Sequence, residues 1–315
     1  MNAILTLHAV AATTLGVRPS LPGPLARSRW WTQPIRAEVY ALLRIGVAVA
    51  LLLDQCLTML PHLDVLFGEG SSGAPHLFGW MFQRPQLHWS LLAGVADLRA
   101  IALLFYLWMA ATAGLLVGWN TRLCSIAVWV LAVSFTNLNT YAINAGDHIR
   151  GMLLLYLMLV PCGAAWSIDA WLGSLRTASP RQAHPWALRL LLIQLAWMYC
   201  SSGLCKLSGY NWPVGNSLYY VMHDLSLTRF SADMLPMPYW MTQLATWSVL
   251  AWEVTFPVLL LFRKTRLPAL LFGVAMHLGI FITMELGCFP LYLLAAYAAL
   301  LWEMAAGRVP APANE

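Results

Sequence analysis

The stretch WALRLLLIQLAWMYCSSGLCKL, residues 186–207, decides the fold class. A run of about 20 mostly apolar residues is long enough for a helix to cross the hydrocarbon core of a bilayer. Near its end stands Lys206, one of only two lysines in the chain. A lysine at that depth must reach the interface, find a partner or lose its proton. A desolvated lysine can therefore act as a base near neutral pH, although a lysine that snorkels at a helix end explains the pattern too.

Apolar runs of similar length recur along the whole chain. Hydrophobic residues make up 60% of the sequence and charged residues only 10%, whereas about a quarter of a soluble domain is charged. No window shows the alternation that is typical of an outer-membrane barrel. We therefore predict a single all-α polytopic membrane domain with about eight transmembrane helices. The predicted segments are Ala37–Met59, Leu98–Trp119, Leu123–Asn144, Ile149–Trp166, Trp186–Leu207, Tyr239–Phe262, Leu267–Glu285 and Phe289–Ala305.

Basic residues fall in alternate loops between these segments, and short cytoplasmic loops are the ones enriched in arginine and lysine. The residues that mark this side are Arg18, Arg27, Arg29, Arg36, Arg122, Arg176, Arg181, Arg263, Lys264, Arg266 and Arg308. Both termini are therefore expected in the cytoplasm, with a segment 1–36, a transmembrane domain 37–306 and a tail 307–315. The same bias explains the formal charge of +5, which does not indicate a nucleic-acid partner.

Motifs of several common enzyme classes are absent from the sequence. It contains no P-loop, no dinucleotide fingerprint, no nucleophile elbow and no HExxH helix. The start of the chain lacks the basic region of a signal peptide. The six cysteines form no CxxC pair and no zinc spacing, so no metal site is predicted. Cys56 and Cys288 both map near the outer face, where a disulfide is permitted but not required.

Ionisable residues gather at or beyond mid-depth on the outer side of the predicted helices. Such residues are rare inside a membrane unless they face a cavity or one another. The residues in these positions are Asp54, Asp97, Arg99, Asp147, His148, Arg150, Lys206, Glu253, His277 and Glu285. Each one alone has a structural explanation, as an interfacial anchor, a loop histidine or a carboxylate bonded across helices. Together they predict a polar site in the outer half of the bundle.

Helical spacing extends this site along the segment that holds Lys206. Tyr199 and Ser202 lie seven and four residues before Lys206, on the same helix face. Gly203 allows a second helix or a ligand to come close. The alternative interpretation is a plain helix–helix contact, in which Ser202 and Gly203 merely permit packing.

Four stretches carry a resemblance to a known family. They are GDHIRGMLLLYLMLVPCGAAWSIDAW (146–171), LLIQLAWMYCSSGLCKLSGYNWPVGNSLYYVM (191–222), AWEVTFPVLLLFRKTR (251–266) and GVAMHLGIFITMELGCFPLYLLAAY (273–297). Together with Arg44 and Asp54 they resemble the HTTM family (horizontally transferred transmembrane domain), whose best-known member is the vitamin K-dependent gamma-carboxylase. GLCKLSGYNWPVG is the most specific part, with WSIDA upstream of it.

The resemblance implies roles for individual residues. In the carboxylase, a lysine in a similar GxxKL context deprotonates the reduced quinone, and the strong base formed after oxygen adds abstracts a proton from a glutamate, which then captures carbon dioxide. Carried over by motif, the expected catalytic residues are Lys206, His148 and His277. The residues expected to bind the quinol are Tyr199, Ser202, Trp197 and Trp212. The expected supporting residues are Asp147, Glu253 and Asp54.

The chain also departs from the carboxylase pattern. Cys205 precedes Lys206 where the carboxylase has a second lysine, and Asp147 stands where it has an asparagine. The likeness does not include the large lumenal domain that helps the carboxylase to bind its propeptide, so peptide recognition by that route is not implied.

The leading hypothesis is an integral membrane enzyme that uses a vitamin K- or menaquinol-like quinol. It would carry out base-initiated carboxylation or oxidation of a peptide or small substrate, in a pocket that faces outward from a bacterial inner membrane. Its partners would be the lipid bilayer and a secreted peptide. One alternative is a non-catalytic membrane protein for the maturation of, or immunity to, a secreted peptide. Another is a subunit of a quinone-linked redox complex.

Overall fold

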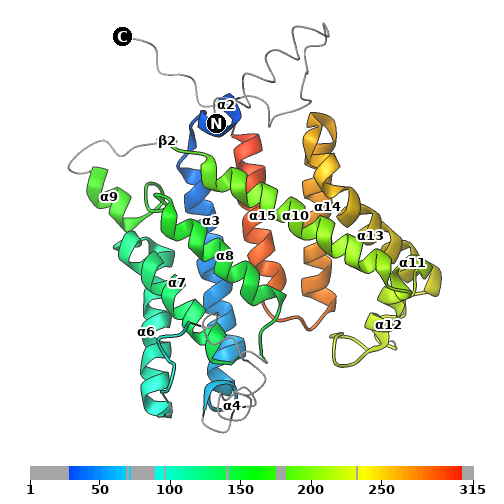
Figure 1. The fold of residues 1–315 in the computed structure, drawn as a ribbon, viewed down its shortest axis with the longest axis horizontal. Helices are drawn as coiled ribbons and strands as arrows, with labels where there is room; N and C mark the ends of the chain where they lie inside the picture. Colours follow the sequence, from blue (N-terminus) through cyan, green and yellow to red (C-terminus); the bar gives the residue numbers. More distant parts are fainter. Residues whose placement is uncertain are drawn as a thin grey trace, which may run out of the picture.

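A computed structural model describes residues 28–68, 71, 89–95, 97–139, 142–174, 182–231 and 233–306. The described chain is mostly helical (Figure 1). Its α-helices are α2 (Ser28–Thr32), α3 (Glu38–Asp54), α4 (Leu63–Phe67), α6 (Leu98–Val117), α7 (Thr121–Leu138), α8 (Ala145–Leu159), α9 (Ile168–Ser174), α10 (Trp186–Ser208), α11 (Asn211–Val214), α12 (Ser217–His223), α13 (Tyr239–Leu261), α14 (Arg263–Thr283) and α15 (Phe289–Ala305). A π-helix (Gln55–Met59) and a 3-10 helix (Leu60–His62) join α3 to α4, and strands β1 (Ile35–Arg36) and β2 (Gln182–Ala183) form one short antiparallel pair.

Within the described residues, six helices are long and apolar enough to cross a membrane. They are the continuous helix Glu38–Phe67 and the helices α6, α7, α10, α13 and α14. Helix α15 is apolar but has only 17 residues, and α8 has 15. Each of the eight segments predicted from the sequence contains one helix, so the all-α membrane class is confirmed. The total of about eight transmembrane helices stays a prediction, because only six of the described helices are long and apolar enough to cross a membrane.

The fourth predicted segment ends earlier than expected. It was predicted to run to Trp166, but α8 begins at Ala145 and ends at Leu159. The next residue, Val160, has extended backbone angles because Pro161 follows it and disfavours the helical conformation before it. Hydropathy alone does not register this stop, since the residues on both sides of it are apolar.

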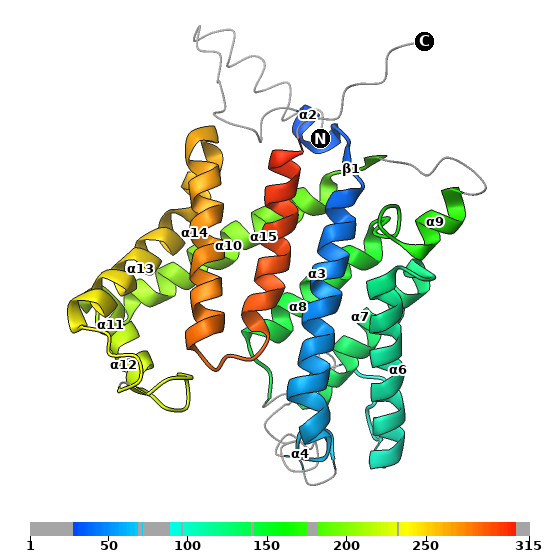
Figure 2. The same ribbon diagram turned by 180° about the vertical axis from the view of Figure 1, so that it is seen from behind.

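Helices α3 and α15 lie side by side through the middle of the bundle, as both views show (Figures 1 and 2). Helix α6 packs against α3 and α7 packs against α6 on one side of this pair, and α14 packs on the other side against α15. Helix α10 runs obliquely across the bundle, from contact with α2 at its first end to contact with α11 at its last end. It packs along α13 for much of its length. One end of α10 therefore lies at α2, while the end that carries Lys206 lies at α11 and α13.

The end of the bundle where α3 begins is held together by polar contacts. Strand β1 pairs with β2, and Arg189 at the start of α10 forms an ion pair with Glu303 at the end of α15, at 2.8 Å. Asp169, in the WSIDA stretch, accepts hydrogen bonds from the backbone amides of Asn120 and Thr121 and thereby caps α7. Partial burial alone would raise the pKa of Asp169, but the hydrogen bonds from Thr121 and Asn120 outweigh it and lower that pKa. The WSIDA stretch therefore has a structural role, since Asp169 connects it to the start of α7.

Reporter fusions test the orientation of the bundle. Because basic residues mark alternate loops, fusions after Arg181 and Arg266 should report a cytoplasmic location. Fusions near Gly70 and Asp224 should report the opposite side. A reversed pattern at either pair would place the Lys206 end of α10 on the cytoplasmic side of the membrane and refute an outward-facing site.

Candidate functional site

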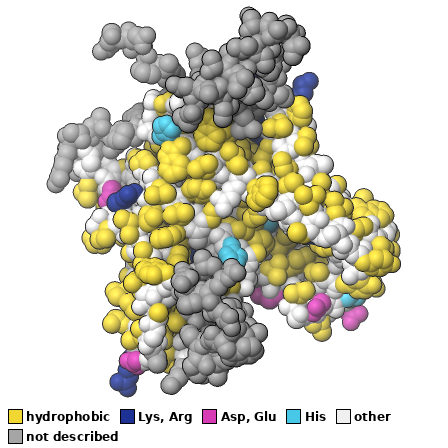
Figure 3. Space-filling model, in the orientation of Figure 1, with side chains coloured by type: hydrophobic (Ala, Val, Ile, Leu, Met, Phe, Trp, Pro, Cys, Tyr) yellow, Lys and Arg dark blue, Asp and Glu magenta, His cyan; other side chains and the backbone are white. Residues whose placement is uncertain are grey.

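A cavity of about 700 Å³ lies among α8, α10, α11, α12, α13, α14 and α15. Its volume is within the range of small-molecule pockets, about 300–1,000 Å³. The described walls are mainly hydrophobic, with Met198, Met222, Met276 and Phe272 among the lining residues. Figure 3 shows a recess lined by hydrophobic side chains beside the lobe formed by α11, α12 and α13. Five of the predicted site residues line this cavity. They are Lys206, Glu253, His277, Tyr199 and Ser202.

Lys206 and Glu253 form an ion pair in the wall of this cavity. The Nζ atom of Lys206 lies 2.5 Å from Oε1 of Glu253, and 4.5 Å from the ring centroid of Trp212. The Lys206 side chain is 24% exposed and the Glu253 side chain 6%. The second carboxylate oxygen of Glu253, Oε2, is buried and has no hydrogen-bond partner among the described residues. Lys206 therefore does not snorkel freely, because a carboxylate and an aromatic ring hold its ammonium group at the cavity.

Tyr199 and His277 form a second polar pair deeper in the wall. The hydroxyl oxygen of Tyr199 lies 2.7 Å from Nε2 of His277, and both residues are buried. The rings of Trp252 and Phe256 pack edge-on against Tyr199, with centroid distances of 4.7 and 5.1 Å. The second ring nitrogen of His277, Nδ1, is buried without a hydrogen-bond partner in the described part of the chain. His277 thus keeps one nitrogen available for a ligand or a water molecule.

Gly203 sets the distance between the two helices that carry the ion pair. A Cβ atom at this position would lie 2.8 Å from Cγ2 of Val254 and 2.9 Å from the Val254 backbone nitrogen. Helices α10 and α13 can therefore approach this closely only because residue 203 has no side chain. The structure thus agrees with the packing interpretation of Gly203, and the same close contact brings Glu253 to Lys206.

Gly203→Ala should lower stability although alanine favours the helix. Overpacking costs about 1–3 kcal/mol, against a gain of about 1 kcal/mol in helix propensity. Gly151→Ala on α8 is the matched control, because a Cβ atom there meets nothing within 4 Å. Thermal unfolding in detergent should show a lower midpoint for Gly203→Ala and an equal or higher one for Gly151→Ala. Equal midpoints for the two variants would mean that α10 and α13 separate without cost.

Some predicted site residues lie away from the cavity. His148 is exposed and is not among the described lining residues, although its neighbours Ala145 and Ile149 are. The structure therefore brings His277 to Lys206 but does not bring His148. Trp197 is 75% exposed on α10 and does not line the cavity, whereas Trp212 does. A tryptophan with its ring on the outer surface of an apolar helix is typical of contact with lipid.

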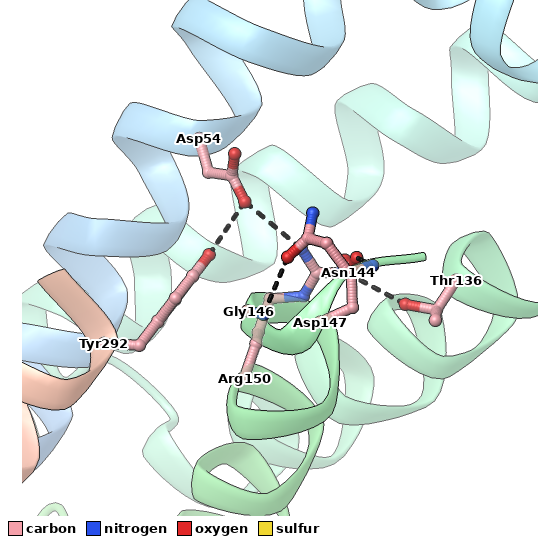
Figure 4. Close-up of polar contacts among 7 residues, drawn as sticks. All are labelled: Asp54, Thr136, Asn144, Gly146, Asp147, Arg150 and Tyr292. Atoms are coloured by element: carbon pink, nitrogen blue, oxygen red, sulfur yellow. Dashed lines mark hydrogen bonds and ion pairs between the residues drawn. The ribbon is translucent and has the colours of Figure 1, made fainter. Parts of the chain in front are cut away.

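Asp54 and Asp147 belong to a separate buried network around Arg150 (Figure 4). The guanidinium group of Arg150 lies 3.2 Å from Asp54 and 2.6 Å from Asp147. It also donates to the hydroxyl of Thr136, while the Tyr292 hydroxyl donates to Asp54. These contacts join α3, α7, α8 and α15. In the structure the two aspartates thus pair with Arg150, and neither is among the described residues that line the cavity with His277.

Asp147 has a second structural role at the start of α8. Its carboxylate accepts from the backbone amide of Asn144, and the Asn144 side chain accepts from the amide of Gly146. This reciprocal capping box satisfies amide groups that the first turn of a helix leaves unpaired.

The sequence did not single out the aromatic residues that surround His277. The rings of Phe289 and Tyr297 lie 5.7 and 5.9 Å from its ring, and both come from α15. A Cβ atom on Gly273 would meet the Tyr297 hydroxyl at 2.4 Å, so this glycine admits the ring. No sequence signal marks these residues, because aromatic residues in an apolar helix are usually core.

Neither a disulfide nor a metal cluster is formed in the described residues. All six cysteines are free thiols, so Cys56 and Cys288 are not paired. Among the described histidine, cysteine, aspartate and glutamate side chains, no group of three or more is arranged to hold a metal ion.

The family model of the HTTM domain matches residues 33–304. The chain belongs to the HTTM domain family. This domain is associated with vitamin K-dependent carboxylase-like membrane proteins, and membership agrees with the apolar helices in making the chain an integral membrane protein. The match includes α3 to α14 in full and nearly all of α15, so every helix that lines the cavity lies within the HTTM domain. No curated protein and no solved structure matches the chain.

Proposed function

We propose that this HTTM protein is a membrane enzyme that binds a lipid-soluble quinol in the cavity and begins its reaction by removing a proton from a ligand hydroxyl. The environment of Lys206 is the observation that carries this proposal. An amine that can exchange protons stands in the wall of a large apolar cavity, with a carboxylate at 2.5 Å and a histidine in the same wall. Ionisable groups grouped in this way inside a membrane protein mark functional sites.

The residues of the cavity fit a flat apolar ligand with hydroxyl groups. Trp212 offers an aromatic face next to Lys206, and the methionine-rich walls exclude water. A bound quinol would supply reducing equivalents and a hydroxyl proton. Lys206 would take that proton at Nζ, and His277 would orient a polar atom of the ligand through its free Nδ1. Ser202 lines the same wall and can donate a hydrogen bond.

The outward orientation of the cavity rests on the distribution of basic residues, and a bacterial inner membrane is the location that agrees with it. The substrate that receives the chemistry is a secreted peptide or a small molecule, modified by carboxylation or oxidation. The family association favours this reading over a subunit of a redox complex that performs no chemistry itself.

The experiment is to purify the protein, extract bound lipids, and measure oxygen uptake on addition of a quinol. Ala245→Trp fills the cavity, since Ala245 lines it, and should abolish both the co-purified quinone and the oxygen uptake. Ala251→Trp is the matched control on the same helix, because Ala251 is exposed and outside the cavity wall. It should retain both signals. Quinone that co-purifies without any turnover would favour a non-catalytic binding protein, and wild-type behaviour of Ala245→Trp would place the ligand elsewhere.

A further inference from the structure

The ion pair raises a question that the role of Lys206 alone does not answer. An ammonium group donates to a carboxylate at the observed 2.5 Å, and an ammonium group has no lone pair with which to take another proton. Lys206 can therefore accept a ligand proton only if it gives up one of its own. The neighbour within hydrogen-bond distance that can receive that proton is Glu253.

Only one of the two carboxylate oxygens of Glu253 has a partner among the described residues. Its Oε1 is in contact with Lys206, whereas its Oε2 is buried and unpartnered within the described residues. A buried carboxylate oxygen without a donor costs free energy. A carboxylate whose only task is to hold Lys206 would be expected to have its second oxygen satisfied as well.

We propose that Glu253 is the terminal proton acceptor of the site and that Lys206 relays the proton to it. The inference rests on the proposed function, since it requires a ligand hydroxyl in the cavity. In the step, the ligand O–H bond breaks as a new N–H bond forms on Lys206 Nζ. Another N–H bond of Nζ breaks as an O–H bond forms on Glu253 Oε1. One proton moves from the ligand to Glu253, and no electron is transferred.

The relay leaves the charges in a favourable arrangement. Lys206 ends as an ammonium group, as it began, and faces the ligand oxygen that has lost its proton. Glu253 ends neutral, so the negative charge beside Lys206 moves from the protein to the ligand. When the ligand leaves, Lys206 can carry the proton from Glu253 back into the cavity, because the Lys206 side chain is 24% exposed whereas that of Glu253 is 6% exposed.

Other titratable groups near the pair are few. Tyr199 on α10 and His277 on α14 form a hydrogen bond with each other. The ring of Tyr297 on α15 packs near the ring of His277, with a centroid distance of 5.9 Å. Helices α8, α11 and α12 contribute no ionisable side chain to the described cavity wall. Glu253 is the only carboxyl group in that wall, so a carboxyl signal that responds to ligand can be assigned by substitution.

The test uses 1-naphthol, a single-hydroxyl ring compound, bound to the purified full-length protein. Ultraviolet absorbance reports whether the bound naphthol is ionised, and infrared difference spectroscopy reports the carbonyl stretch of a newly protonated carboxyl group. In the wild-type protein both signals should rise together on binding. The carboxyl band should be lost in Glu253→Gln and should return at a shifted frequency in Glu253→Asp. Lys206→Met should lose both changes, because nothing then links the hydroxyl to Glu253.

Each other result counts against one of the two proposals. Naphthol that ionises in the wild-type protein without a carboxyl band would overturn the relay and leave Lys206 as the final base. A band that persists in Glu253→Gln would belong to another carboxyl group, and naphthol that binds without ionising would show that no proton transfer occurs. Either would also overturn the relay. Two results together would instead refute the proposed function of the cavity. Naphthol would fail to bind, and Ala245→Trp would leave the co-purified quinone and the oxygen uptake unchanged.

Discussion

Lys206→Arg is expected to abolish turnover while expression and membrane insertion stay normal. Arginine keeps the positive charge and can still pair with Glu253, but a guanidinium group does not lose its proton at accessible pH. If Lys206 must exchange protons, the loss should be about 10²–10⁴-fold, the usual contribution of general acid–base catalysis. Oxygen uptake with added quinol, and mass spectrometry of the quinone and of a candidate peptide, would measure it.

The chain offers a matched control for this substitution. Lys264, the only other lysine, is exposed at the start of α14, so Lys264→Arg makes the same chemical change away from the cavity. It should leave turnover unchanged. Lys206→Ala should differ from both, since a small amine supplied in solution can occupy the vacated space and should restore part of the activity. Full activity in Lys206→Arg would mean that the residue acts only as a charge, and the binding-protein alternative would then be preferred.

Apolar run length was enough to find the long helices of this fold. All eight predicted segments contain a helix. A helix that crosses a bilayer needs a long apolar stretch, and such a stretch can be recognised directly in the sequence. The stop at Leu159 was missed because it depends on the backbone restriction before Pro161, which hydropathy does not measure. The short helices α11 and α12, which close one side of the cavity, carry no strong periodic signal in so few residues.

The candidate site was only partly visible in the sequence. Lys206, Glu253 and His277 were singled out because charged or titratable residues inside apolar helices are rare, and they do line one cavity. The partner of each residue depends on how the helices cross, and spacing within one helix does not give that. Asp54 and Asp147 fall within the same outer region by depth, yet α3 and α8 turn them toward Arg150. Depth in the membrane predicts which residues can meet, and the helix rotation decides which do.

Arg150→Leu is expected to be strongly destabilising, because it leaves two carboxylates without their cation inside the bundle. Arg150 is 2% exposed and contacts both Asp54 and Asp147. Removing one partner of a buried ion pair typically costs about 3–5 kcal/mol, mainly because the remaining charge is stranded. Thermal unfolding in detergent, followed by circular dichroism, should show a large fall in the midpoint. Arg263→Leu, at an exposed arginine, should show little change.

A double substitution separates the cost of stranded charge from the loss of packing. Arg150→Leu with Asp54→Leu removes one of the two carboxylates that have lost their cation, while the other, Asp147, keeps its hydrogen bond from the Asn144 amide. Replacing a whole buried ion pair by apolar residues is often nearly neutral, so the double variant should recover much of the stability that Arg150→Leu loses. If the double variant is as unstable as the single one, the network matters through its shape and its hydrogen bonds to Thr136 and Tyr292. Recovery would instead show that Asp54 is retained at a cost, as the counter-charge that allows Arg150 to join α3, α7 and α8.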